Sequence, residues 1–167
     1  MKDFNLFMSQ LSETNATLES FTDFDKVSRN VARIAIKLNQ LNYLLGKNDL
    51  RRAITELFEE NPSTFEVLDI LVAVRSSDNK KVLNDDYKPV LVQCYFSDVE
   101  HIFEFIEKTG LAEVFASKKI TNLVDYVFGV EVGLDTNARK NRGGNIMAAA
   151  VAKKFTDAGV EFRTEGN

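Results

Sequence analysis

The sequence of 167 residues contains no tryptophan, two prolines, one cysteine and one histidine. A single cysteine, Cys94, excludes a disulfide within the chain and a zinc site built from several cysteines. It also favours a reducing, cytoplasmic setting, because stable disulfides belong to oxidising compartments. With His101 as the sole histidine, we do not expect a catalytic triad.

Long apolar stretches are also missing. No run approaches about 18 uninterrupted apolar residues, so the sequence predicts no membrane-spanning helix. Residues 1–15 carry acids and polar residues early, so a signal peptide is not expected either. A hydrophobic share of 44% and a charged share of 28% are typical of a globular protein, and the length suffices for one domain with its own core.

Acidic residues are absent from one long segment. The chain has a net charge of −4, yet no Asp or Glu lies between positions 136 and 156. Residues 118–167 carry eight Lys and Arg against six Asp and Glu, whereas the first 117 residues carry 13 against 19. This uneven distribution predicts a local anion-binding surface on an otherwise acidic protein.

Apolar residues recur every three or four positions along most of the chain, which predicts a mainly α fold. Glycine and asparagine mark several helix boundaries, and a capping box of Ser97 and Glu100 is expected to start one helix. The predicted helices cover 27–45, 50–58, 65–74 (buried and central), 98–109, 111–117, 122–133 and 146–158. In the last of these, Ile146, Ala150 and Val151 are expected to face inward.

Two short segments alternate apolar and polar residues or are rich in β-formers, which predicts strands. A ribbon of 80–83 with 91–96 is expected to be paired, and Cys94 within it is expected to be buried. Residues 160–163 form the second candidate. A lone strand cannot satisfy its backbone, so we expect the chain to stop before a helix–strand unit is complete.

The basic segment, residues 134–145, reads LDTNARKNRGGN. Arginine presents a planar fork of donors that suits a phosphate or a guanine edge, and asparagine pairs a donor with an acceptor. The two glycines are expected to let a backbone approach a ligand, and Asn145 to cap a helix whose first amides point at an anion. The alternative is a solvated basic loop whose glycines only form a turn.

The basic segment, with LVDYV before it and Met147 after it, resembles the signature of the DpnII/MboI-type restriction endonucleases, which cut duplex DNA at GATC. A looser likeness at FTDFDKVSRNV (21–31) extends the resemblance over essentially the whole chain. It implies a homodimeric, Mg²⁺-dependent enzyme with a helical N-terminal region and a nuclease core of the PD-(D/E)XK kind. The residues to which it gives contacts with double-stranded DNA are Asn137, Arg139, Lys140, Asn141, Arg142, Gly143, Gly144 and Asn145.

Two departures from the family pattern set further expectations. Ala148 stands where the family has an acidic residue after the methionine, and family members continue beyond position 167 with the Asp and Glu that hold the metal. We therefore expect residues 1–117 to form a helical region, and residues 118–167 to form the signature segment and the start of a truncated α/β nuclease core. Phosphodiester hydrolysis needs carboxylate-held Mg²⁺, so this chain alone is expected to bind no Mg²⁺ and to cut no DNA.

Two alternatives remain open. Glu131 and Asp135 lie four residues apart, so on a helix they share a face and are weak candidates for holding a metal or orienting Arg139. They are equally able to pair with local cations and stabilise the turn. At the level of function, the alternative to a nuclease is a non-catalytic remnant, or a helical module that binds DNA or a partner without cutting.

Overall fold

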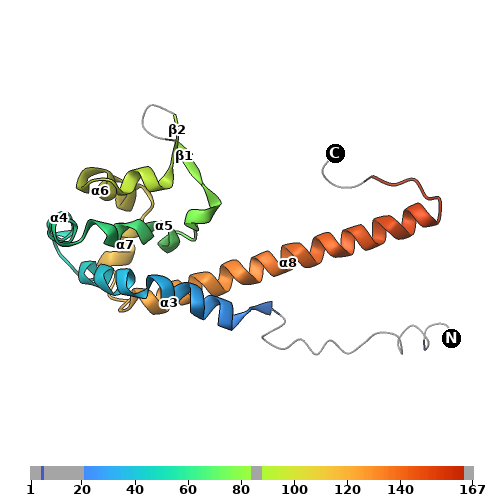
Figure 1. Ribbon diagram of the computed structural model, residues 1–167, viewed down its shortest axis with the longest axis horizontal. Helices are drawn as coiled ribbons and strands as arrows, with labels where there is room; N and C mark the ends of the chain where they lie inside the picture. The colour runs from blue at the N-terminus through green and yellow to red at the C-terminus, as the bar shows by residue number, and fades with distance from the viewer. Residues whose placement is uncertain (1–4, 6–20, 84–87, 164–167) are drawn as a thin grey trace. The chain divides into compact units, whose positions relative to one another are not determined.

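A computed structural model describes residue 5, residues 21–83 and residues 88–163, and these fold mainly into helices, as predicted (Figure 1). The expectation that residues 1–15 form no signal peptide concerns a segment that, apart from residue 5, lies outside the described residues. The chain divides into two compact units, one formed by Phe24–Asp135 and the other by Met1–Asp23 with Thr136–Asn167. None of the helices that the structure describes is long and apolar enough to cross a membrane.

The unit Phe24–Asp135 begins with α3, Phe24–Leu41, which continues into a 3-10 turn at Asn42–Leu44. The apolar positions that predicted this helix, among them Val27 and Leu38, are buried in the core. Gly46 follows with a φ of +72°, a conformation that glycine adopts without strain. The predicted helix and its glycine stop are therefore confirmed.

The next helix, α4, spans Leu50–Glu60. Its first turn is capped by Asp49, whose Oδ1 accepts a hydrogen bond of 3.0 Å from the backbone N–H of Arg52. The helix ends before Pro62, because proline has no backbone N–H to donate to a carbonyl of the preceding turn. This element, too, agrees with the sequence prediction.

The predicted central helix over 65–74 is buried but is not one continuous helix. A 3-10 helix, Pro62–Val67, leads into the single turn α5, Leu68–Leu71. Phe65 and Leu68 are fully buried. The run is apolar on several sides, so burial was predictable from composition, whereas the choice between helix types was decided by packing around it.

The predicted ribbon consists of β1, Lys81–Leu83, and β2, Pro89–Leu91, which pair antiparallel with Val82 opposite Val90. The second strand ends earlier than predicted, because Val92–Phe96 forms a 3-10 helix. Three side chains of that helix, at positions 92, 95 and 96, are buried, a spacing that a strand cannot provide on one face. Cys94 is consequently exposed, so the prediction that it is buried was wrong.

Two further helices follow, α6 (Val99–Lys108) and α7 (Leu111–Ala116). Asp98, rather than the predicted capping box of Ser97 and Glu100, caps α6 by accepting a hydrogen bond of 3.0 Å from the backbone N–H of His101. The same carboxylate also contacts the imidazole one turn on, with 2.6 Å between Oδ2 of Asp98 and Nδ1 of His101. The glycine stop after α6 is confirmed, with a φ of +76° at position 110.

The last helix, α8, spans Leu123–Asp157. Its first turns belong to the unit Phe24–Asp135, where Leu123 and Val127 are fully buried. The backbone N–H of Leu123 donates to Oδ1 of Asn42 at 2.8 Å, and the hydroxyl of Tyr126 donates to the carbonyl of Leu71 at 2.9 Å. The predicted start is confirmed, since the Asn122 side chain accepts from a backbone amide of the first turn.

The predicted interruption of this helix between Gly133 and Asn145 was wrong, because α8 runs through the whole segment. Neither Gly143 nor Gly144 has a positive φ. A glycine inside a helix costs about 1 kcal/mol relative to alanine, and the surrounding arginine, lysine, methionine and alanine residues are strong helix formers. The local sequence therefore tolerates the glycines without breaking the hydrogen-bond ladder.

Helix α8 ends at a Schellman motif. Gly159 has a φ of +68°, its N–H donates to the carbonyl of Thr156 at 3.0 Å, and the N–H of Val160 donates to the carbonyl of Phe155 at 3.0 Å. The ring of Phe162 then lies 5.6 Å from that of Phe155. Residues 160–163 form no strand, so the predicted terminal strand was wrong; this segment turns back on the helix end instead.

Candidate nucleic-acid interface

From Thr136 on, the basic segment lies on the part of α8 that belongs to the unit of Met1–Asp23 with Thr136–Asn167. At 100° per residue, Arg139 and Arg142 share one side of the helix, and Asn137 and Asn141 fall on the other side. Asn145 lies one turn after Arg142, about 60° from it around the helix. The side chains from position 140 to 150 are all exposed. The predicted DNA-contacting residues are therefore displayed around a helix, not gathered in a loop.

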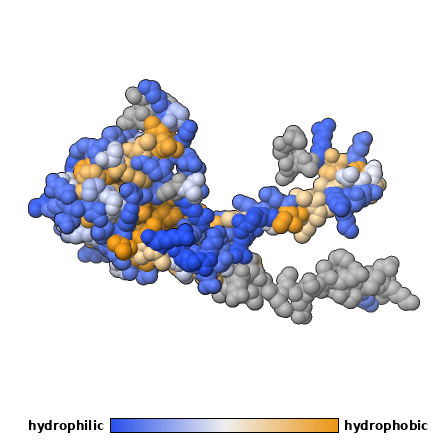
Figure 2. Space-filling model, in the orientation of Figure 1, coloured by the Kyte–Doolittle hydropathy of each residue, from blue (hydrophilic) through white to orange (hydrophobic). Residues whose placement is uncertain are grey.

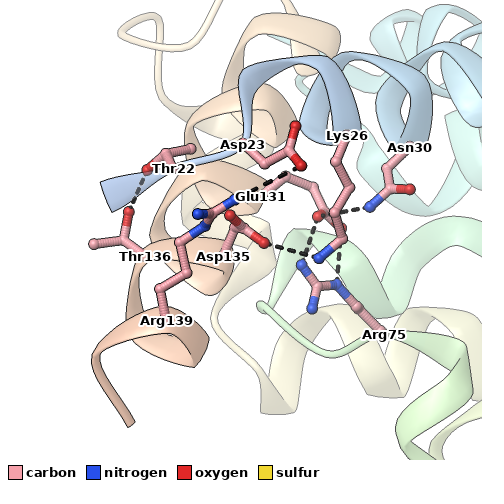
Figure 3. Close-up of polar contacts among 9 residues, drawn as sticks. All are labelled: Thr22, Asp23, Lys26, Asn30, Arg75, Glu131, Asp135, Thr136 and Arg139. Carbon is pink, nitrogen blue, oxygen red and sulfur yellow. Dashed lines mark hydrogen bonds and ion pairs between the residues drawn. The ribbon is translucent and has the colours of Figure 1, made fainter. Parts of the chain in front are cut away.

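Arg139 is held by an acidic side chain within its own unit. Its Nη2 lies 3.6 Å from Oδ2 of Asp23, and one turn earlier the hydroxyls of Thr136 and Thr22 share a hydrogen bond of 2.6 Å (Figure 3). Both partners of the ion pair remain about one-third exposed, with side-chain fractions of 33% and 38%. A phosphate oxygen is a ligand of the same kind as this carboxylate, so the arginine is oriented by a group that an anion can replace.

Lys140 and Arg142 have a different environment. Neither forms an ion pair with any residue that the structure describes, and both are exposed. No acid follows them in the sequence until position 157. They are consequently the two cations of the basic segment that are most readily available to an external anion.

The glycines and Asn145 differ from expectation. A Cβ added at Gly143 or Gly144 would meet no atom within 4 Å, so nothing in this structure requires glycine there. Asn145 lies inside α8, so the prediction that it caps a helix was wrong, and no helix start directs amides at an anion from this position. What the glycines provide is a stretch of helix surface without side chains.

The apolar positions further along α8 are also exposed. Ile146 is 71% exposed and Val151 44% exposed, so the prediction that they face a core was wrong. The buried residues of α8 all come before position 136. Val151 and Phe155 instead line a shallow groove with Phe162 and Arg163.

Glu131 lies in the other unit and is 4% exposed. Arg75 donates to both of its carboxylate oxygens, and Asn30 donates to Oε2 at 3.3 Å (Figure 3). Burial raises the pKa of Glu131, but the hydrogen bonds from Arg75 and Asn30 outweigh it and leave that pKa below its usual value. The carboxylate is therefore ionised and fully paired at neutral pH.

Asp135, one turn further on, is 1% exposed and accepts a hydrogen bond of 2.8 Å from Nζ of Lys26. Both weak candidates for a metal site are thus engaged by cations from other segments of the unit. Among the residues described here, no group of three or more His, Cys, Asp or Glu side chains is placed to hold a metal ion. Glu131 and Asp135 as arranged do not fit a Mg²⁺ ion, which needs open carboxylate oxygens in octahedral geometry.

The sequence had not identified Lys26, Asn30 or Arg75 as partners of these two carboxylates. Arg75 and Glu131 are 56 positions apart, and Lys26 and Asp135 are 109 apart. The sequence pointed to these partners only indirectly. Glu131 and Asp135 lie on a helix face that also carries core residues, and buried carboxylates need cationic or hydrogen-bonding partners.

Comparison with known proteins supports the resemblance found in the sequence. The family model described as DpnII restriction endonuclease matches residues 3–167. The chain is 54% identical over 162 residues to the type II restriction enzyme MboI of Moraxella bovis, covering 97% of this chain and 58% of that protein. It is 41% identical to the type II restriction enzyme MjaIII of Methanocaldococcus jannaschii, covering 90% of this chain and 54% of that protein.

A third relative is the type II restriction enzyme DpnII of Streptococcus pneumoniae, which is 36% identical over 149 residues. That match covers 87% of this chain and 51% of that protein. The chain therefore spans about half the length of the curated relatives it matches. No solved structure matches it.

Proposed function

Because the chain belongs to the DpnII restriction endonuclease family, we propose that it is the DNA-contacting part of a type II restriction endonuclease acting on double-stranded DNA at GATC. The observation that carries the proposal is the family match across residues 3–167, since relatives over this range are named type II restriction enzymes. The GATC sequence is what the resemblance to DpnII/MboI-type enzymes implies. The same resemblance underlies a homodimer as part of the proposal, and the single cysteine underlies a cytoplasmic setting.

The basic segment supplies the contacts in this proposal. Lys140 and Arg142 meet phosphates first, because they are exposed and pair with no described acid. Arg139 exchanges the carboxylate of Asp23 for a phosphate oxygen, and the glycines keep the helix surface narrow where a DNA strand passes. Asn137 and Asn141 on the other side of the helix, with Asn145 one turn after Arg142, are the candidates for contacts with sugars or base edges.

The resemblance implies a Mg²⁺-dependent nuclease core of the PD-(D/E)XK kind, whose metal lowers the barrier to attack by water. We assign neither Glu131 nor Asp135 to that site, because Arg75, Asn30 and Lys26 occupy their oxygens. The 167-residue chain is accordingly proposed to bind duplex DNA without cutting it, which is the behaviour of a helical binding module.

Fluorescence anisotropy with a GATC duplex at several salt concentrations tests the binding proposal. We expect Arg139→Ala with Arg142→Ala to weaken binding and to lower the slope of log Kobs against log[salt] by about 0.9 for each phosphate that the variant no longer neutralises. Lys153→Ala with Lys154→Ala is the matched control, since it removes two exposed cations from the same helix. An Arg139/Arg142 variant that behaves like this control would remove the basic segment from the interface.

Incubation with MgCl₂ and the same duplex tests the second part. We expect no cleavage by the purified 167-residue chain, and a duplex lacking GATC serves as the control for contaminating nucleases. Cleavage confined to the GATC duplex would show that the chain assembles a metal site after all. The non-cutting proposal would then be wrong, and the restriction endonuclease proposal would be strengthened.

A further inference from the structure

Four cations lie on one side of α3. Lys26, Arg29, Arg33 and Lys37 are spaced by three, four and four residues, which places them within one sector of the helix. The outer two are neutralised locally: Lys26 pairs with Asp135, and Lys37 pairs with Glu66. The inner two, Arg29 and Arg33, are named here the α3 arginine pair, and their surroundings differ from those of the two lysines.

The α3 arginine pair, Arg29 and Arg33, is exposed and forms no ion pair or hydrogen bond with any residue in the described part of the chain. Asp25, four residues before Arg29, is also exposed, but the two do not meet in an ion pair. Like charges four apart on a helix destabilise it by about 0.2–0.5 kcal/mol. Two uncompensated arginines in an acidic region are therefore a cost that an external anion relieves.

We propose that the α3 arginine pair is a second phosphate-contacting surface, in the unit Phe24–Asp135, that binds the backbone of duplex DNA. Figure 2 shows strongly hydrophilic residues gathered over α3. A spacing of four residues corresponds to a rise of about 6 Å along the helix, and B-DNA carries one phosphate per ~3.4 Å of axis on each strand. The two guanidinium groups can thus contact different phosphates.

The chemistry of the surroundings favours a nucleic-acid backbone over a protein partner. Arginine presents a fork of donors that matches phosphate oxygens, and Ala32, directly before Arg33 in the sequence, is small and exposed, which leaves room for close approach. The one feature that suits a protein partner is Ile36, which is 77% exposed on the next turn. This inference rests on the proposed function, because it takes duplex DNA as the ligand.

The experiment compares two double variants of equal charge in the same salt titration with a GATC duplex. Arg29→Ala with Arg33→Ala removes the pair, and Arg51→Ala with Arg52→Ala removes two arginines of the same unit that are already paired, with Glu100 and Glu56. We expect the first variant to lower the salt slope by about 1–2 and to weaken binding roughly 10- to 100-fold at ~0.1 M salt. The second should keep the wild-type slope, and circular dichroism should show both folded.

The outcomes separate this inference from the proposed function. Equal slopes for the two double variants overturn the role of α3, while the Arg139 and Arg142 variant still decides the basic segment on its own. A wild-type chain that binds no duplex overturns both. A third result also overturns the α3 role. If Ile36→Ser binds DNA as the wild type does but sediments with a different mass, this face is a protein interface.

Discussion

The guanidinium of Arg75 donates two hydrogen bonds to the carboxylate of Glu131, from Nε to Oε1 at 3.2 Å and from Nη2 to Oε2 at 2.7 Å. This two-point contact joins the segment after α5 to α8 within the unit Phe24–Asp135. Asn30 of α3 adds a third donor to the same carboxylate. Glu131 is thus a polar centre where three separate segments of the chain converge, which is why its removal is expected to be felt across the unit.

Arg75→Ala should destabilise the protein by about 3 kcal/mol, because it leaves the buried carboxylate of Glu131 without its cation and with Asn30 as its remaining side-chain donor. The free energy of unfolding in urea measures this effect. Arg52→Ala is the control: that arginine pairs with Glu56 on the surface and should cost less than about 1 kcal/mol. Equal effects of the two substitutions would show that the Arg75–Glu131 contact is no more than a surface ion pair.

Gly143→Ala and Gly144→Ala should each stabilise the helical state by about 1 kcal/mol, since both glycines lie in α8 with open space around the position of a Cβ. Circular dichroism should show more helix, and amide hydrogen exchange around position 144 should slow. Gly110→Ala is the opposite control, because its φ of +76° strains any residue with a side chain. Faster exchange in the Gly143 variant would favour the turn that the sequence predicts.

The pKa of His101 should lie above the ordinary value, because its imidazole hydrogen-bonds to the carboxylate of Asp98 and is attracted by its charge. Because the pKa of His101 is raised in the folded protein, its protonated form stabilises the fold. This stabilisation is fully present below about pH 6.5 and is lost as the pH rises through the pKa of the folded protein. Proton NMR reads this titration cleanly from the sole histidine.

Asp98→Asn is the matched variant for that titration. Asparagine still caps α6, so the helix should persist while the negative charge beside the imidazole is removed. We expect the pKa of His101 to fall toward its ordinary value. An unchanged titration curve would mean that the contact between the two side chains is not maintained in solution.

Mg²⁺ should not stabilise this chain through Glu131 and Asp135, because cations of the protein already occupy both carboxylates. The melting temperature should agree within about 1 °C between MgCl₂ and NaCl at equal ionic strength, since a ligand raises it only by binding the folded state. A clear rise in MgCl₂ that disappears in Glu131→Gln with Asp135→Asn would overturn this expectation.

Residue spacing alone specified the helices whose apolar residues repeat at helical intervals, such as α3 and α4, and the glycine stops at Gly46 and Gly110. It also determined the position and charge of the basic segment. These features depend on neighbours within one or two turns, so the information that specifies them is local.

Packing between distant segments specified which carboxylates are buried and which cations they bind. Arg75 and Glu131 meet across 56 positions, and no local pattern specifies a contact of that range. The structure also showed that α8 is continuous, although glycines and asparagines in the basic segment favoured a turn. The physical reason is a balance of small terms: a helix tolerates about 1 kcal/mol per glycine when strong helix formers flank it, and a sequence window does not show which term prevails.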